Sequence, residues 1–221
     1  MIGSLNEKPL HAALKDWYRR AGDLVEEPVG GFVVDLVRDD LLIEIQTRGF
    51  SAMRRKLDRL LDDRRIRLVH PVAAVKWIVK LDGGAREVSR RRSPKRGVAA
   101  DVCAELVSFP SLLDHPNFVL EVLLTEEEEV WRPDSRGWRR GGFAVEERRL
   151  LGVVDAVEFR SPADLRALLP EGLPDPFTTK DLAGLLGRTR HAAQEVAYCL
   201  RESGALETVG RDRRGHLYGR P

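Results

Sequence analysis

The sequence is poor in cysteine and in long apolar runs. Its 221 residues include two cysteines, Cys103 and Cys199, which form neither a CxxC pair nor a cluster with zinc-ligand spacing. A disulfide scaffold is therefore excluded, and a structural zinc site is not expected. No run of 18 apolar residues is present, and the first residues do not resemble a signal peptide. We expect a cytoplasmic protein without a membrane segment.

Common catalytic motifs are missing as well. The chain has no P-loop, no GxSxG or HExxH motif and no dinucleotide-binding fingerprint, so an NTPase, a serine hydrolase or a zinc protease has no support. The composition that is present, 43% hydrophobic and 33% charged residues, is typical of a folded globular chain.

The charge is nearly balanced overall but unevenly distributed. The net charge is +2, whereas the segment Arg86–Gly97 alone holds six bases and one acid, and residues 176–221 hold eight bases and five acids. An acidic run, Glu126–Glu129, lies between them. Basic blocks on a near-neutral chain predict an anionic partner at defined places, and DNA is the partner that we expect.

The order of the predicted elements indicates an α/β core with a mixed sheet. A helix begins after Asn6, with Leu10 and Leu14 on its buried face. A second helix has Leu57 on its buried face and Lys56 among its outward-facing residues. The segment Ser89–Gly97 is interpreted as a loop. Strands are expected at 23–28, 31–37, 41–47, 66–72, 75–81, 118–124 and 153–159, and a further helix at 98–107.

Prolines and glycine at Leu169–Pro176 interrupt regular structure and predict a linker. Ser161 followed by Pro162 marks a helix start just before it. We assign this helix to the C-terminal part, which divides the chain into residues 1–160, an α/β domain, and residues 161–221, a small helical module.

Two strands of the core each place one carboxylate among apolar residues, Asp35 in Phe32–Val37 and Glu44 in Leu41–Ile45. If a hairpin joins these strands, the two carboxylates lie nearly opposite each other. Burying two adjacent negative charges is costly, and a hard divalent cation removes that cost. The pattern therefore predicts an oxygen-ligand site for Mg²⁺ or Mn²⁺. The alternative is that both carboxylates face solvent or pair with arginines such as Arg48 or Arg54.

Over residues 5–82 the order of elements, together with Asp35 and Glu44-Ile45-Gln46, resembles the PD-(D/E)xK nuclease superfamily. The resemblance implies that Asp35 and Glu44 hold the metal ion and that Ile45 offers its carbonyl. Gln46 would occupy the position of the lysine that assists the attacking water. Glu7 matches the acidic residue that many members carry on their first helix, although the helix dipole also favours an acid there.

Two positions depart from the family pattern. Val34 precedes Asp35 where proline is common, and Gln46 replaces lysine. Glutamine can orient a water molecule through hydrogen bonds but carries no charge. Lys56 or Lys76 could supply the charge from elsewhere in the fold. We therefore carry two hypotheses, a Mg²⁺-dependent DNA nuclease and an inactive nuclease-fold protein that binds DNA and regulates transcription. A subunit of a larger repair or defence complex is a third, and a homodimer is possible in each case.

The C-terminal part resembles a winged helix-turn-helix module. Thr178 and Thr189 are expected to cap two helices, and a basic hairpin follows around Gly210–Gly215. The resemblance implies that the second helix enters the major groove and that the hairpin meets the DNA backbone. A solvated loop balanced by Glu126–Glu129, and a helical module that binds protein, are the alternatives for the two basic regions. The predicted DNA-contacting residues are Arg90, Arg91, Arg92, Lys95, Arg96, Arg190, Gln194, Arg201, Arg211, Arg213 and Arg214.

Overall fold

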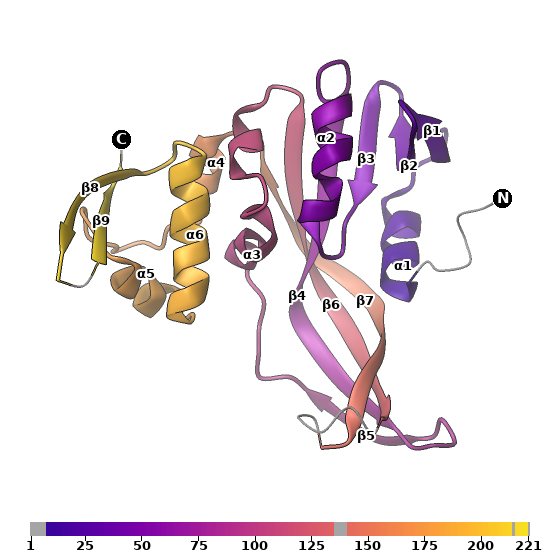
Figure 1. The fold of residues 1–221 in the computed structure, drawn as a ribbon. Helices are drawn as coiled ribbons and strands as arrows, with labels where there is room; N and C mark the ends of the chain where they lie inside the picture. Colours follow the sequence, from indigo (N-terminus) through magenta and orange to yellow (C-terminus); the bar gives the residue numbers. More distant parts are fainter. Residues whose placement is uncertain (1–7, 135–140, 214, 221) are drawn as a thin grey trace.

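The computed structural model describes residues 8–134, 141–213 and 215–220. In this part of the chain, a seven-stranded mixed sheet forms the centre of an α/β fold, which confirms the predicted class (Figure 1). Neighbouring strands are antiparallel except at the two central pairs, which are parallel. The strands follow each other across the sheet as β1 (Leu24–Val29), β2 (Phe32–Arg38), β3 (Leu41–Ile45), β4 (Arg65–Leu81), β6 (Phe118–Pro133) and β7 (Phe143–Phe159), and β5 (Glu87–Arg92) pairs with the far end of β4.

Helices cover both faces of the sheet. On one face, α1 (Pro9–Tyr18) packs Leu10 and Leu14 against Ile43 of β3. On the other face lie a 3-10 turn η2 (Phe50–Met53) and α2 (Arg54–Leu60), whose buried residues share a cluster with Leu42. Because side chains alternate along a strand, Glu44 lies on the same face of β3 as Leu42, toward α2.

The first helix begins later than predicted. We expected a start after Asn6, whereas α1 begins at Pro9, with Lys8 as its N-cap residue. Proline suits the first helical position because its fixed φ is helical and the missing N–H would have no partner there. Glu7 lies outside the described residues, so its expected place on this helix is not part of the structure.

The strands β4, β6 and β7 are much longer than predicted. The second halves of β4 and β6 and the first part of β7 extend past the helices as a narrow projection (Figure 1). We call this part the arm (residues 75–92, 126–133 and 143–152). The predicted separation of 66–72 from 75–81 is wrong, because β4 continues through with only a register irregularity between Ala73 and Val75.

Pro71 lies inside β4 without breaking it. The Val69 carbonyl accepts a hydrogen bond from the Gln46 N–H at 2.9 Å, so the odd-numbered residues here direct their backbone groups toward β3. The pairing between β3 and β4 ends at Val69. Pro71 lies two residues further on and directs its backbone to the same side, where β3 no longer offers an acceptor. The missing N–H of Pro71 therefore costs no hydrogen bond.

The segment Arg86–Gly97 is not a simple loop. Its first half forms β5, an edge strand that pairs antiparallel with β4 at the end of the arm. The chain then returns to the body and forms the predicted helix as two short pieces, η3 (Ala99–Val102) and α3 (Cys103–Leu106), followed by η4 (Pro110–Asp114).

The C-terminal part contains three helices and a hairpin whose local signals were read correctly. Side chains of Ser161, Thr178 and Thr189 accept hydrogen bonds from backbone N–H groups at their helix N-termini, as predicted. Gly187 adopts a left-handed conformation (φ 61°) that ends the second of these helices. The elements are α4 (Pro162–Arg166), α5 (Thr179–Leu186), α6 (Arg190–Glu202), β8 (Glu207–Asp212) and β9 (Gly215–Gly219).

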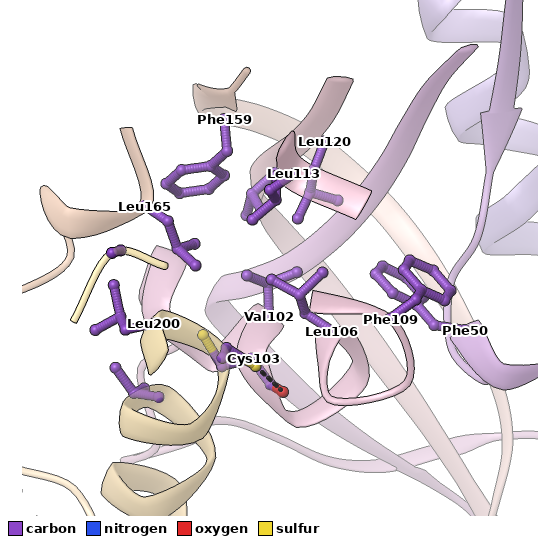
Figure 2. Close-up of a cluster of buried hydrophobic side chains, with 14 of the residues drawn as sticks. Phe50, Val102, Cys103, Leu106, Phe109, Leu113, Leu120, Phe159, Leu165 and Leu200 are labelled. Atoms are coloured by element: carbon purple, nitrogen blue, oxygen red, sulfur yellow. Dashed lines mark hydrogen bonds between the residues drawn. The ribbon is translucent and has the colours of Figure 1, made fainter. Parts of the chain in front are cut away.

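The two predicted parts of the chain share one cluster of buried side chains. Leu165 and Leu200 pack with Val102 and Leu106, and the Cys199 thiol donates to the Cys103 carbonyl at 3.6 Å (Figure 2). The linker at Leu169–Pro176 contains no helix or strand. The division of the chain into two domains at residue 160 stays a prediction. Residues from both sides of this position contribute to the same apolar core.

No helix in the described ranges combines the length and the apolar character that crossing a bilayer requires.

Candidate functional site

Asp35 and Glu44 meet where the β2–β3 hairpin separates. The ladder between β2 and β3 ends at the pair Leu36 and Ile43, so Asp35 and Glu44 occupy the next opposed positions. Beyond this pair, the Asp35 side chain replaces a backbone carbonyl as the hydrogen-bond partner of β3. Its Oδ2 accepts a hydrogen bond from the Ile45 N–H at 2.8 Å. The predicted opposition of the two carboxylates is therefore present, together with the backbone of Ile45.

Glu44 is a buried carboxyl group with an altered acidity. Its residue is 6% exposed, and burial, followed by the charge of Asp35, raises its pKa to about 7 against the opposing effect of Lys56. The alternative of a solvent-facing Glu44 is wrong. At neutral pH this site therefore holds a carboxyl group that is close to gaining or losing its proton.

Asp35 is held in its charged form. Burial acts to raise its pKa, but the contact with His11 and the Ile45 amide outweigh burial and hold the pKa below its usual value. His11 comes from α1, and its Nε2 lies 3.3 Å from Asp35 Oδ2. The proposed pairing of Asp35 with Arg48 or Arg54 is not what the structure shows, since Arg54 pairs with Asp58.

Lys56 reaches into the site from α2. Its ammonium group forms an ion pair with Glu44 and donates a hydrogen bond to the Val33 carbonyl at 2.5 Å. The lysine side chain is only 11% exposed, so its predicted outward orientation is wrong. A lysine stem is long enough to bring the charge back toward a buried carboxylate from the edge of a helix. Lys76, the other lysine considered, pairs with Glu129 of the arm at 3.0 Å.

Gln46 is tied into the turn that follows β3. Its side-chain Nε2 donates to the Gly49 carbonyl at 3.2 Å. Its backbone carbonyl accepts from Nδ1 of His70 at 2.7 Å, and burial lowers the pKa of His70, so this ring is neutral. These bonds fix the end of β3. The side-chain oxygen of Gln46 is the atom of this residue that can contact a further group.

The oxygen atoms of the site are few, but they are of the kind that binds Mg²⁺ or Mn²⁺. In the described part of the chain, no group of three or more His, Cys, Asp or Glu side chains is arranged to hold a metal ion. Mg²⁺, however, is often held by one or two carboxylates and several waters. Glu44 Oε1 is buried and accepts no hydrogen bond among the described residues, although Lys56 neutralises it. Asp35, Glu44 and the Ile45 carbonyl are thus a fitting but minimal oxygen set.

His11 is the site residue that the sequence did not reveal. A histidine on a helix is common, and no spacing links it to Asp35, 24 residues away. The available signal was its place next to Leu10 and three residues before Leu14, at the border of the buried helix face.

The predicted DNA-contacting residues of β5 and the segment after it are exposed, and Arg90 has an acidic partner. Arg90, Arg91 and Arg92 lie on β5, and Lys95 and Arg96 follow it. Arg90 forms an ion pair with Glu128 and lies over the Trp77 ring at 5.1 Å. Among the described residues, Arg91 and Arg92 have no acidic group within 4 Å. The alternative in which Glu126–Glu129 balances this segment therefore holds for Arg90 alone.

The predicted DNA-contacting residues of the C-terminal part differ in exposure. Arg190 and Gln194 are exposed on α6, and Arg211 and Arg213 are exposed on the hairpin. Arg201 is partly buried and pairs with Glu202 at 2.5 Å. Arg214 lies outside the described residues.

The fold and this site define an α/β protein with two paired carboxylates at the end of a hairpin. The chain belongs to the family described as "Domain of unknown function (DUF8091)", whose model matches residues 8–160. It is 32% identical over 184 residues to an uncharacterized protein of Treponema pallidum (strain Nichols), covering 82% of this chain and 73% of that protein. No solved structure matches the chain. The family region contains the carboxylate site, and the similarity to the Treponema protein extends into the remaining part of the chain.

Proposed function

We propose that this protein binds DNA and hydrolyses phosphodiester bonds as a Mg²⁺-dependent nuclease. The observation that carries the proposal is the convergence of Asp35, Glu44 and the Ile45 backbone where β2 and β3 separate. Burial and the neighbouring Asp35 raise the pKa of Glu44 to about 7, so the ionised form of Glu44 is costly in this site. A divalent cation bound to the carboxylates would offset that cost.

The ligands would be the two carboxylates and the Ile45 carbonyl. The N–H of Ile45 faces Asp35, and the carbonyl of a strand residue faces the same neighbour as its N–H. When bound, Mg²⁺ or Mn²⁺ supplies a water of lowered pKa and stabilises negative charge on the phosphate oxygens.

Lys56 is the residue that fits the role of the missing lysine. It places a positive charge against Glu44 from a different element, α2, while position 46 holds a neutral glutamine. The Lys56 ammonium group can stabilise the negative charge that develops on the phosphate, and the Gln46 side-chain oxygen can accept a hydrogen bond from the attacking water. His11 holds Asp35 in its charged form and is a positioning residue.

DNA binding is supported by the surfaces outside the site. The exposed arginines of β5 present positive charge along the arm. The helix α6 followed by the β8–β9 hairpin resembles a winged helix-turn-helix. In this arrangement, Arg190 and Gln194 would meet base edges, and Arg211 and Arg213 would meet phosphates.

A catalytically inactive DNA-binding regulator is the second candidate. Its support is Gln46, which replaces the lysine of the family pattern and whose amide nitrogen is occupied by Gly49. In this case, the contact between Lys56 and Glu44 would be a structural ion pair.

The test compares Asp35→Asn, Glu44→Gln and Lys56→Met with Glu171→Gln, an exposed carboxylate in the linker that follows α4. Supercoiled and single-stranded DNA are incubated with Mg²⁺ or with EDTA, and cleavage and gel shifts are measured in the same samples. Loss of a ligand or of the lysine should reduce cleavage by about 10²–10⁴-fold. Glu171→Gln should cleave like the wild type.

Thermal unfolding supplies a second measurement that does not depend on cleavage. Added Mg²⁺ should raise the Tm of the wild type and leave that of Glu44→Gln unchanged, because a ligand that binds the folded state stabilises it. Tight DNA binding without cleavage in any sample would instead support the regulator.

A further inference from the structure

A cavity of about 550 Å³ lies between the start of α1, the segment after β3 and the arm. Leu10 lines it and precedes His11, the partner of Asp35, while Thr47 lines it and follows Gln46. Chain connectivity therefore places the cavity next to the candidate site, where α1 lies beside the base of the arm (Figure 1).

Most of the charged groups that line the cavity are paired. Lys76 is balanced by Glu129, and Arg148 by Glu127. The two other acidic residues of the wall, Glu146 and Glu147, pair with Arg132 and Arg149. Arg48 is exposed, and in the described ranges no acidic group lies within 4 Å of it.

Apolar side chains also line the cavity, namely Pro9 and Leu10 from α1 and Ala144 and Val145 from β7. An arginine that has no acidic partner among the described residues, in a cavity with apolar lining, matches a nucleotide, which has an anionic phosphate and a flat base.

Resting on the proposed nuclease function, we propose that this cavity binds one nucleotide of single-stranded DNA beside the phosphate that is cleaved. Arg48 pairs with the backbone phosphate, and the base lies against Pro9 and Val145. Cavities of about 300–1,000 Å³ enclose one small ligand. A cavity of this volume that encloses one nucleotide has no room for the complementary nucleotide. The substrate therefore has an unpaired strand at the site.

The test measures DNA affinity in EDTA, so that it is independent of metal and of cleavage. The probes are a short fluorescent oligothymidylate and a blunt hairpin duplex, read by fluorescence anisotropy. Arg48→Ala removes the cation, and Ala144→Trp fills the cavity without a change of charge. Arg64→Ala is the matched control, because Arg64 is exposed and lies 12 residues before Lys76, about 40 Å along β4.

We expect Arg48→Ala and Ala144→Trp each to weaken single-strand binding by about tenfold and to leave duplex binding unchanged. Arg64→Ala should bind both probes like the wild type. The inference is overturned if the wild type does not bind the single strand, or if both cavity variants keep its affinity, or if both lose duplex binding equally.

The two proposals can fail separately. If Glu44→Gln abolishes cleavage while both cavity variants bind the single strand normally, the nuclease stands and the cavity assignment is wrong. If the cavity variants lose single-strand affinity while Glu44→Gln cleaves like the wild type, the cavity binds DNA and the nuclease site is wrong.

Discussion

Two buried acidic regions of the protein, the end of the β2–β3 hairpin and the acidic run of the arm, have different surroundings. At the end of the β2–β3 hairpin, Asp35 and Glu44 lie against each other, Asp35 contacts the His11 ring, and Glu44 forms an ion pair with Lys56. On the arm, each carboxylate of the acidic run has a donor of its own. The donors are Trp77 for Glu126, Arg148 for Glu127, Arg90 for Glu128 and Lys76 for Glu129.

This difference distinguishes charged pairs that stabilise the fold from carboxylates that form a candidate functional site. Matched pairs along the arm tie four strands together and leave no acid in need of a ligand. At the hairpin, burial and mutual repulsion raise the pKa of Glu44 to about 7, so the ionised form is costly there. A group maintained at such a cost is a candidate for chemistry, and the matched pairs of the arm are not.

The largest expected change in stability comes from breaking a matched pair of the arm. Glu127 is fully buried, and its carboxylate pairs with Arg148 at 2.6 Å and accepts from the Thr125 hydroxyl at 2.7 Å. Glu127→Gln leaves the Arg148 charge without its partner and should lower the free energy of unfolding by about 3–5 kcal/mol. Urea unfolding measures this change.

The control for this pair is Glu146→Gln, whose partner Arg132 forms a half-exposed ion pair. Solvent screening should keep its effect below about 1 kcal/mol. Equal effects of the two variants would show that the arm does not depend on its buried pairs.

The second prediction concerns the pH dependence of stability. The folded pKa of Glu44 lies above its ordinary value, so the folded state binds the proton more tightly than the unfolded state. Its contribution is present below about pH 4.5 and is lost as the pH rises to about 7, which amounts to about 3 kcal/mol at most. Asp35 has a lowered pKa and acts in the opposite direction, below its ordinary value of 3.8.

Unfolding curves between pH 4 and 8 test this directly. Wild-type stability should fall across the window, and Glu44→Gln should flatten the decline because the amide does not titrate. A wild-type profile that matches that of the variant would contradict the assigned burial of an ionisable Glu44.

The smallest expected effect distinguishes the β5 arginine that has an acidic partner from those that have none in the described part of the chain. Arg91 and Arg92 have no acidic group within reach among the described residues, whereas Arg90 pairs with Glu128. Arg91→Ala should weaken duplex binding a few-fold and reduce the slope of log affinity against log salt by about 1. Arg90→Ala should change this slope less, because its charge is already balanced. Equal slopes for the two variants would remove the arm from the DNA interface.

Local signals gave the most reliable predictions. The caps at Ser161, Thr178 and Thr189 depend on contacts within three residues, which the chain order alone determines. The failures share a different feature. Continuity of β4 through Pro71 depends on where β3 stops, and the strand β5 depends on an open edge of β4.

The sequence by itself determined the alternation that buries Glu44, the hairpin that opposes it to Asp35, and the mixed α/β order. These follow from periodicity and turn chemistry over a few residues. Only the tertiary structure decided which charges meet these carboxylates. His11 and Lys56 come from two helices on opposite faces of the sheet, 24 and 12 residues away from their partners. Such meetings depend on how helices pack and how far a long side chain reaches, and no local pattern in the chain encodes them.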